Sequence, residues 1–233
     1  PLHLVAKART PELGRFPRPE TTGRISAMGL ARQLVARGAD VNARATKEIN
    51  DGYRHRVTWI GTTPFFVAAK GVDHQMMRVL VAAGADPLLA NADGTTPLMA
   101  ASGVEMFYSG EDDGTDEDSL QAVTLALSLG GDVAAVSRKG ETALHGAAKR
   151  GYLPLLRLLI DRGARLDAKN EKGWTPLTVA LGYEKGNPIN LFQAERATLD
   201  AAALLMDVMA ARGLVIDENT DALVKLMAYK EKR

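Results

Sequence analysis

The chain has 233 residues, of which 46% are hydrophobic and 24% are charged, and its formal net charge is +1. A charge this close to zero, with no basic cluster interleaved with aromatic residues, argues against nucleic-acid binding. No apolar run approaches the ~20 residues that a membrane helix needs, and the absence of cysteine excludes disulfides, thiolate catalysis and zinc–thiolate sites.

A short phrase recurs along the chain at a regular distance. Thr-Pro or a close variant of it opens the phrase at positions 1, 64, 97, 143 and 176. Pro64 and Pro97 are 33 positions apart, as are Ala143 and Pro176, and a glycine follows 20 positions after both Pro64 and Ala143. A fixed period of this length indicates a stacked repeat of a turn and two helices.

The local chemistry of the phrase favours a helix start. In Thr63-Pro64 and Thr175-Pro176 the threonine hydroxyl is suited to cap the helix, and proline at the next position needs no amide hydrogen there. Thr142 keeps the cap without the proline. The glycine after each second helix permits the left-handed backbone that ends a helix.

The phrases divide the chain into approximate repeats at 1–57, 58–90, 91–136, 137–169 and 170–216, followed by a C-terminal capping helix at 217–233. Repeats one and five exceed the plain spacing by 17 residues and repeat three by 13, in each case between the two helices. The turn that joins repeats one and two gains 13. Long insertions cost little loop-closure entropy. We expect a single elongated domain, N-terminally truncated because the chain begins inside a repeat.

The phrases at 94–98, 140–144 and 173–177 resemble those of ankyrin-repeat proteins, and the resemblance covers the whole chain. The long inter-helix and inter-repeat insertions are similar to those of the bacterial type. The resemblance implies an all-α ankyrin-repeat solenoid with short β-turn or hairpin loops, about five repeats and a C-terminal cap. It also implies a protein or peptide partner and no cofactor. Because such bacterial chains are often exported, a periplasmic or secreted location is favoured over a cytoplasmic one.

Two of the four histidines, His3 and His145, occupy the histidine position of the ankyrin phrase. The resemblance implies that their rings hold neighbouring turns together by hydrogen bonds. Phe66, Met99 and Thr178 replace the histidine in the other repeats, so these bonds cannot run unbroken along the stack. The other two histidines, His55 and His74, have no carboxylate or histidine partner at metal-ligand spacing, and we expect no metal site.

The acidic stretch 111–118, from Glu111 to Asp118, is the sharpest local anomaly. Its spacing departs from the helix-loop-helix calcium pattern, which needs alternating acids, a central glycine and a later glutamate. Carboxylates just before a predicted helix at 119–129 would instead favour the positive N-terminal end of that helix. We expect solvated acidic side chains here, with cation binding as the alternative.

The ankyrin resemblance also implies where a partner would bind, since the turn tips and first helices line the concave side. By phase, the residues two to four before each Thr-Pro and those six and seven after each proline should face that groove. The candidates are Trp59, Ile60, Lys70, Arg138, Lys139, Lys149, Arg150, Glu171, Lys172, Trp174 and Tyr183, with Lys7 near the N-terminal end. Tryptophan and arginine are residues that interface hot spots favour.

No glycine-rich phosphate loop, paired carboxylates or Ser-His-Asp arrangement points to catalysis, so we expect no enzyme. The favoured function is a non-catalytic protein-binding scaffold that uses the concave face and the insert loops, including the long turn at 53–59. The alternative is a structural subunit of a larger homo- or hetero-assembly. In that case Phe107 and Tyr108, in the insertion of repeat three, would make lateral contacts.

Overall fold

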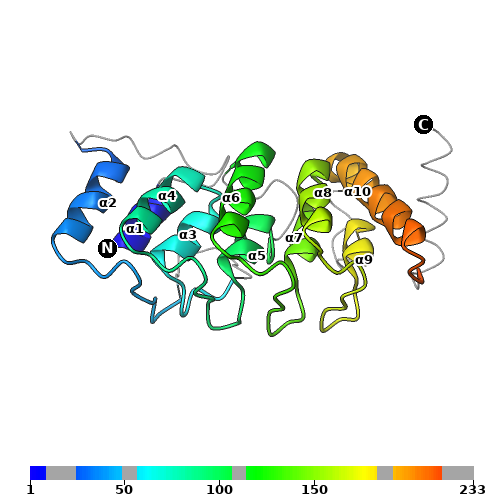
Figure 1. Cartoon of the computed structure of the whole chain (residues 1–233), viewed down its shortest axis with the longest axis horizontal. Helices are drawn as coiled ribbons and strands as arrows, with labels where there is room; N and C mark the ends of the chain where they lie inside the picture. The colour runs from blue at the N-terminus through cyan, green and yellow to red at the C-terminus, as the bar shows by residue number, and fades with distance from the viewer. Residues whose placement is uncertain (9–24, 49–56, 107–113, 183–190, 217–233) are drawn as a thin grey trace.

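The computed structural model describes residues 1–8, 25–48, 57–106, 114–182 and 191–216, with side chains of the last segment described from residue 198 onward. Figure 1 shows helices side by side along the long axis, with turns that project from one edge. The described residues contain no strand, and the predicted all-α solenoid is confirmed. The helices are α1 (Leu2–Ala8), α2 (Ala27–Ala36), α3 (Pro64–Lys70), α4 (His74–Ala82), α5 (Pro97–Ser102), α6 (Asp116–Ser128), α7 (Ala143–Arg150), α8 (Leu153–Asp161), α9 (Pro176–Ala180) and α10 (Leu191–Ala211).

The helices form pairs, and the pairs stack in two rows. The odd-numbered first helices α1 to α9 contact one another in order, and the even-numbered second helices α2 to α10 form the other row. One hydrophobic core runs the length of the stack, from Leu2 through Leu80 and Leu156 to Met209. Each pair therefore buries its apolar side chains against its neighbours, as expected where the core is spread along an axis.

Threonine hydroxyls start the first helices, as the sequence predicts. Thr63 accepts a hydrogen bond from the amide of Phe66 at 3.1 Å, and Thr175 accepts one from Thr178 at the same distance. Proline occupies the first helical turn after both threonines. The predicted caps are confirmed at these positions, where the hydroxyl satisfies an amide that the helix leaves without a backbone partner.

Helix α6 begins three residues earlier than predicted. The expectation was a helix at 119–129, whereas the structure has Asp116–Ser128. The Thr115 hydroxyl accepts from the Asp118 amide at 3.1 Å, and the Asp118 carboxylate accepts from the Thr115 amide at 3.0 Å. This hydrogen bonding to Thr115 lowers the pKa of Asp118. The acidic side chains at 116–118 thus belong to the first turn of the helix, where they favour its positive end.

The turns between repeats are joined in register by backbone hydrogen bonds. The donor and acceptor pairs are Ala92 N with Ile60 O at 2.9 Å, Arg138 N with Asp93 O at 2.8 Å and Glu171 N with Lys139 O at 2.8 Å. Gly140 has φ +76, and a Cβ there would lie 2.7 Å from Cα of Asn170. The close approach of successive turns therefore requires glycine at this tip.

Several predictions from the sequence fall outside the described residues. The predicted insertions centre on residues 9–24, 49–56, 107–113 and 183–190, and the predicted cap occupies 217–233. Phe107, Tyr108 and Tyr183 belong to these segments, as does the start of the acidic stretch at Glu111. The repeat boundaries and the cap stay predictions.

Candidate functional site

A groove of about 250 Å³ opens along the first helices and turns of the third to fifth helix pairs. The turn after α5 and the helix α7 form one wall, and the turns at 137–141 and 170–174 contribute the other. The groove is lined by charged, titratable and aromatic side chains, among them Glu105, Lys139, His145, Lys149, Lys172 and Trp174.

Asn170 fixes the turn that carries Lys172 and Trp174. Its Oδ1 accepts from the backbone amides of both residues, at 3.0 Å each. Its Nδ2 donates to Oε1 of Glu141, in the preceding turn, at 2.8 Å. The Asn170 side chain thereby satisfies two amides of its own turn and links this turn to the preceding one. These bonds hold the groove lining in place.

His145 links two repeats from the floor of the groove. Its Nδ1 accepts from the amide of Thr142 at 3.1 Å, so Nε2 carries the proton and donates to the Trp174 carbonyl at 3.0 Å. His3 makes the equivalent contact, with Nε2 2.9 Å from the Thr62 carbonyl. The predicted hydrogen bonds between neighbouring turns are confirmed for both histidines. Burial lowers the pKa of His145, and the nearby Glu141 carboxylate opposes this only in part.

A chain of polar contacts extends from the groove residues Glu105 and Lys139 to the turn that carries Asp93. Lys139 Nζ lies 2.6 Å from Oε1 of Glu105 and 3.5 Å from Oδ2 of Asp93. The Thr58 hydroxyl donates to the same Asp93 oxygen. Burial alone would lower the pKa of Lys139, but the two carboxylates outweigh it and raise this pKa. Lys139 is therefore a charged ammonium that links its own turn to the turn of Asp93 and to Glu105, which follows α5.

Glu105 is the unusual member of this chain. Its backbone has φ +66, in the left-handed region that few residues other than glycine adopt. Its side chain is 5% exposed, and burial raises the pKa of its carboxyl despite the hydrogen bond from Lys139. The structure thus holds a costly backbone conformation and a poorly solvated carboxylate at the edge of a groove.

The same groove also has an aromatic side chain in its lining. Lys172 Nζ lies 4.5 Å from the centroid of the half-buried Trp174 ring. Lys149, from α7, donates to the backbone carbonyl of Met106. Flat aromatic surface beside fixed cations and carboxylates is suited to recognise an extended chain by stacking and polar contacts.

The sequence of one part of the chain matches a known family. Residues 115–195, which include α7, α8 and the Trp174 turn, match the model "Ankyrin repeats (3 copies)". The chain contains ankyrin repeats. The groove therefore lies on the side of the ankyrin stack that the first helices and turn tips form.

Curated proteins with similar sequences come from eukaryotes, and three of them are mammalian proteins. Bovine mitochondrial disaggregase is 32% identical over 152 residues, which cover 64% of this chain and 18% of that protein. The mouse B-cell lymphoma 3 protein homolog is 34% identical over 121 residues, 52% of this chain and 24% of that protein. Mouse ankyrin repeat and SOCS box protein 16 is 34% identical over 119 residues, 51% of this chain and 25% of that protein.

This chain spans a quarter or less of the length of these three relatives. The similarity therefore concerns the ankyrin repeats and not the rest of those proteins. The bacterial type of the ankyrin insertions stays a prediction, because these relatives are mammalian.

The ankyrin groove brings together part of the set that the sequence predicts. Lys139, Lys149, Glu171, Lys172 and Trp174 line it. Ile60, Lys70 and Arg138 do not line this groove, although Ile60 and Arg138 are exposed on neighbouring turns.

Two of the predicted partner contacts are buried, which corrects the expectation that they are exposed. Trp59 is 6% exposed, since its ring packs into the core and Lys7 Nζ lies 5.2 Å over it. Arg150 is 4% exposed, and its Nη1 lies 3.9 Å from Oδ1 of Asp116, at the start of α6. Both side chains hold the ankyrin stack together, so neither is proposed below as a partner contact.

Three groove residues escaped the sequence analysis. Asn170 left a usable signal, because Asn91 stands at the same position of an earlier repeat and its Oδ1 likewise accepts from two amides of its own turn. Glu141 takes the same position in its repeat as Trp174, directly before the threonine, so its place in the groove could have been predicted by analogy. Glu105 left no signal, since it follows the end of a short helix where the repeat pattern dictates no residue type.

Within the described ranges, no group of three or more His, Cys, Asp or Glu side chains is placed to hold a metal ion. In the same part of the chain, no helix combines the length and the apolar character that crossing a membrane requires.

The buried His145 predicts how stability depends on pH. Its folded pKa is lowered, so the unfolded chain binds the proton first, and stability falls as pH drops below about 6.5. One proton taken up only on unfolding gives a slope of at most about 1.4 kcal/mol per pH unit. Urea unfolding between neutral pH and pH 5 measures it, and His145→Gln should flatten the slope. An equally steep slope in His145→Gln would show that other groups cause it.

Proposed function

We propose that this chain is a non-catalytic protein-binding scaffold that holds an extended segment of a partner protein in the groove between its third and fifth helix pairs. Ankyrin repeats are protein-interaction modules, and the match to that family supports a protein partner. The location of the contact is inferred from the residues that line the groove. It is confined to the groove, because the insert loops lie outside the described residues.

One observation carries the proposal. The half-buried Trp174 lines the groove, and the side chain of Asn170 holds its turn by hydrogen bonds. A rigid aromatic side chain loses little conformational freedom on binding, which is the property of an interface anchor. Lys172 and Lys149 flank it and can orient the polar backbone of a bound segment.

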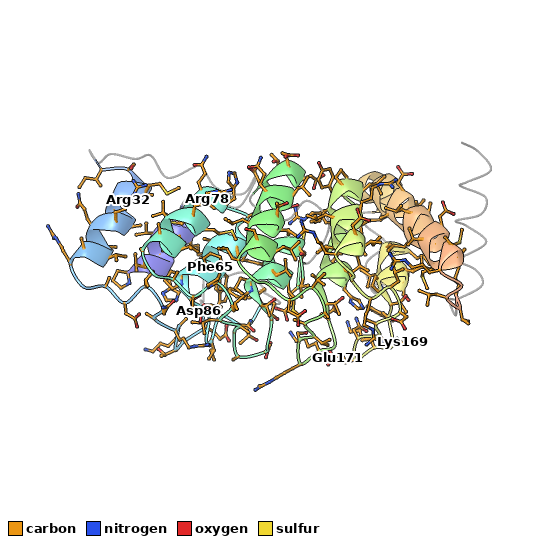
Figure 2. The ribbon with its side chains drawn as sticks, viewed as in Figure 1. Arg32, Phe65, Arg78, Asp86, Lys169 and Glu171 are labelled. Carbon is orange, nitrogen blue, oxygen red and sulfur yellow. The ribbon has the colours of Figure 1, made fainter. Side chains whose placement is uncertain are left out.

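Figure 2 shows that the opposite edge of the stack differs. Arg32 and Arg78 extend from the second helices, whereas Glu171 lies at the turn edge. A shallow surface there, which these two arginines line with small side chains of α4, has no aromatic residue. Of these two surfaces, only the groove offers an aromatic side chain, Trp174, as an anchor for a partner.

Trp174→Ala should weaken the binding of peptides that the chain selects. We would select random linear peptides by phage display on the purified chain and measure their affinities by calorimetry. Truncation of an anchor tryptophan commonly costs about 2 kcal/mol or more, roughly a thirtyfold loss of affinity. Because Trp174 also packs against the core, its thermal midpoint must be measured alongside.

Leu88→Ala is the matched control for lost exposed apolar surface. Leu88 is 49% exposed and does not line the groove. Peptides should bind this variant as tightly as they bind the wild type. If Trp174→Ala is folded and binds every selected peptide normally, the groove is not the binding site.

A further inference from the structure

The second carboxylate oxygen of Glu105 is an unusual buried acceptor. Oε1 accepts from Lys139 at 2.6 Å, but Oε2 is buried and has no hydrogen-bond partner in the described part of the chain. Only 5% of the Glu105 side chain is exposed, and the residue lines the groove. A buried acceptor that lacks a donor costs free energy, which a bound donor would recover.

The charges around this oxygen favour a cationic donor. Lys139 contacts two carboxylates at once, those of Glu105 and Asp93, and the charge of Lys70 also acts to lower the pKa of Glu105. Glu141 and Glu171 line the same groove. Of the other groove lysines, Lys149 donates to the Met106 carbonyl and Lys172 lies over the Trp174 ring.

The groove also favours one kind of cation. A guanidinium is planar, it stacks on aromatic rings, and it carries five N–H donors that can reach more than one carboxylate. Trp174 supplies the ring, and Glu105 and Glu141 supply carboxylates in one groove. An ammonium offers no flat face to the ring and is more strongly hydrated.

We propose that the groove takes one arginine side chain of the bound segment, whose guanidinium donates to Oε2 of Glu105. This inference rests on the proposed function, because it names the chemistry of the partner at the same groove. A bound guanidinium would account for the unfavourable backbone conformation and poor solvation of Glu105. The strained backbone at φ +66 and the incomplete hydrogen bonding hold an acceptor ready for a charged donor.

The test uses a defined probe on the whole chain. N-acetyl-arginine methylamide would be titrated into the ¹³C-labelled protein, with the side-chain carboxyl carbon of Glu105 followed by NMR. The reference probe is N-acetyl-citrulline methylamide, which has the same shape without the charge. We expect a saturable shift with the arginine probe and affinity for the citrulline probe about tenfold lower or less, since charged hydrogen bonds are the stronger ones.

Two variants check that Glu105 is the acceptor. Glu105→Gln keeps the shape and removes the charge, and it should lose the preference for arginine over citrulline. Asp161→Asn removes an exposed carboxylate at the end of α8, outside the groove, and should keep that preference. Thermal midpoints confirm that both variants fold. The comparison of the two probes on the wild type needs no variant. It therefore tests the inference even if the Glu105→Gln variant does not fold.

The outcomes separate this inference from the proposed function. Equal binding of the two probes by the wild type, or no shift at Glu105, would mean that only water occupies Oε2 and would overturn the inference. Selected peptides that need Trp174 but contain no required arginine would overturn it while leaving the proposed function in place. A specific arginine shift, with no selected peptide that depends on Trp174, would overturn the proposed function instead.

Discussion

Gly146→Ala is expected to lower the free energy of unfolding by about 3 kcal/mol, because the added methyl group overpacks the interface between α5 and α7. Glycine to alanine in a helix normally stabilises by about 1 kcal/mol, so the expected sign is reversed. A Cβ at Gly146 would lie 2.4 Å from N of Val104 and 2.7 Å from C of Gly103. Both are backbone atoms, and no rotamer change can relieve the contact.

The reversal depends on how closely the two first helices approach, and Gly29→Ala is the control. Gly29 also lies within a helix, α2, and its Cβ would meet only the side chains of Ile25 and Ser26 at 3.3 Å. Urea denaturation followed by circular dichroism should show no loss of stability for this variant and a gain of up to about 1 kcal/mol. Equal stabilities for the Gly146 and Gly29 variants would mean that α5 and α7 lie further apart than the structure has them.

Leu156→Ala is expected to cost about 3 kcal/mol, the usual result of removing a fully buried leucine and leaving a cavity. Leu156 lies in α8, is fully buried and belongs to the core that joins all the helix pairs. Because each repeat is stabilised by its neighbours, the loss should reach beyond α8 and lower the cooperativity of unfolding.

Val136→Ala provides the comparison for Leu156→Ala. Val136 is 55% exposed on the turn before α7, and its truncation should change stability by less than about 0.5 kcal/mol. Urea unfolding of the two variants at one pH measures the difference. If Leu156→Ala unfolds at the same urea concentration as Val136→Ala, the second helices do not pack as described.

The repeat phrase made the helix starts and the register of the turns predictable from the sequence. A threonine directly before a proline is typical of a helix N-cap, and Thr63 and Thr175 both cap helices in the structure. His145 was predictable for a related reason, because its position in the phrase places it under the next turn. These features are local or repeat at a fixed spacing, so each can be recognised without knowing the fold.

The features that the sequence did not reveal depend on contacts between distant segments. Trp59 occupies a turn tip by phase, yet its ring packs into the core beneath Lys7 of the first repeat. Glu105 meets Lys139 only because α5 ends beside a turn 34 positions further along the chain. Spacing predicts which face a residue takes on its own element, and it does not predict what a neighbouring repeat places over it.

Hydrogen exchange on the complex of this chain with a selected peptide tests the central claim most directly. The account predicts added protection of backbone amides at 137–141 and 170–174 and in α7, whose residues form the groove, and no change in α2 and α4 at the Arg32 and Arg78 edge. Protection confined to α2 and α4, with the groove segments unchanged, would contradict the account.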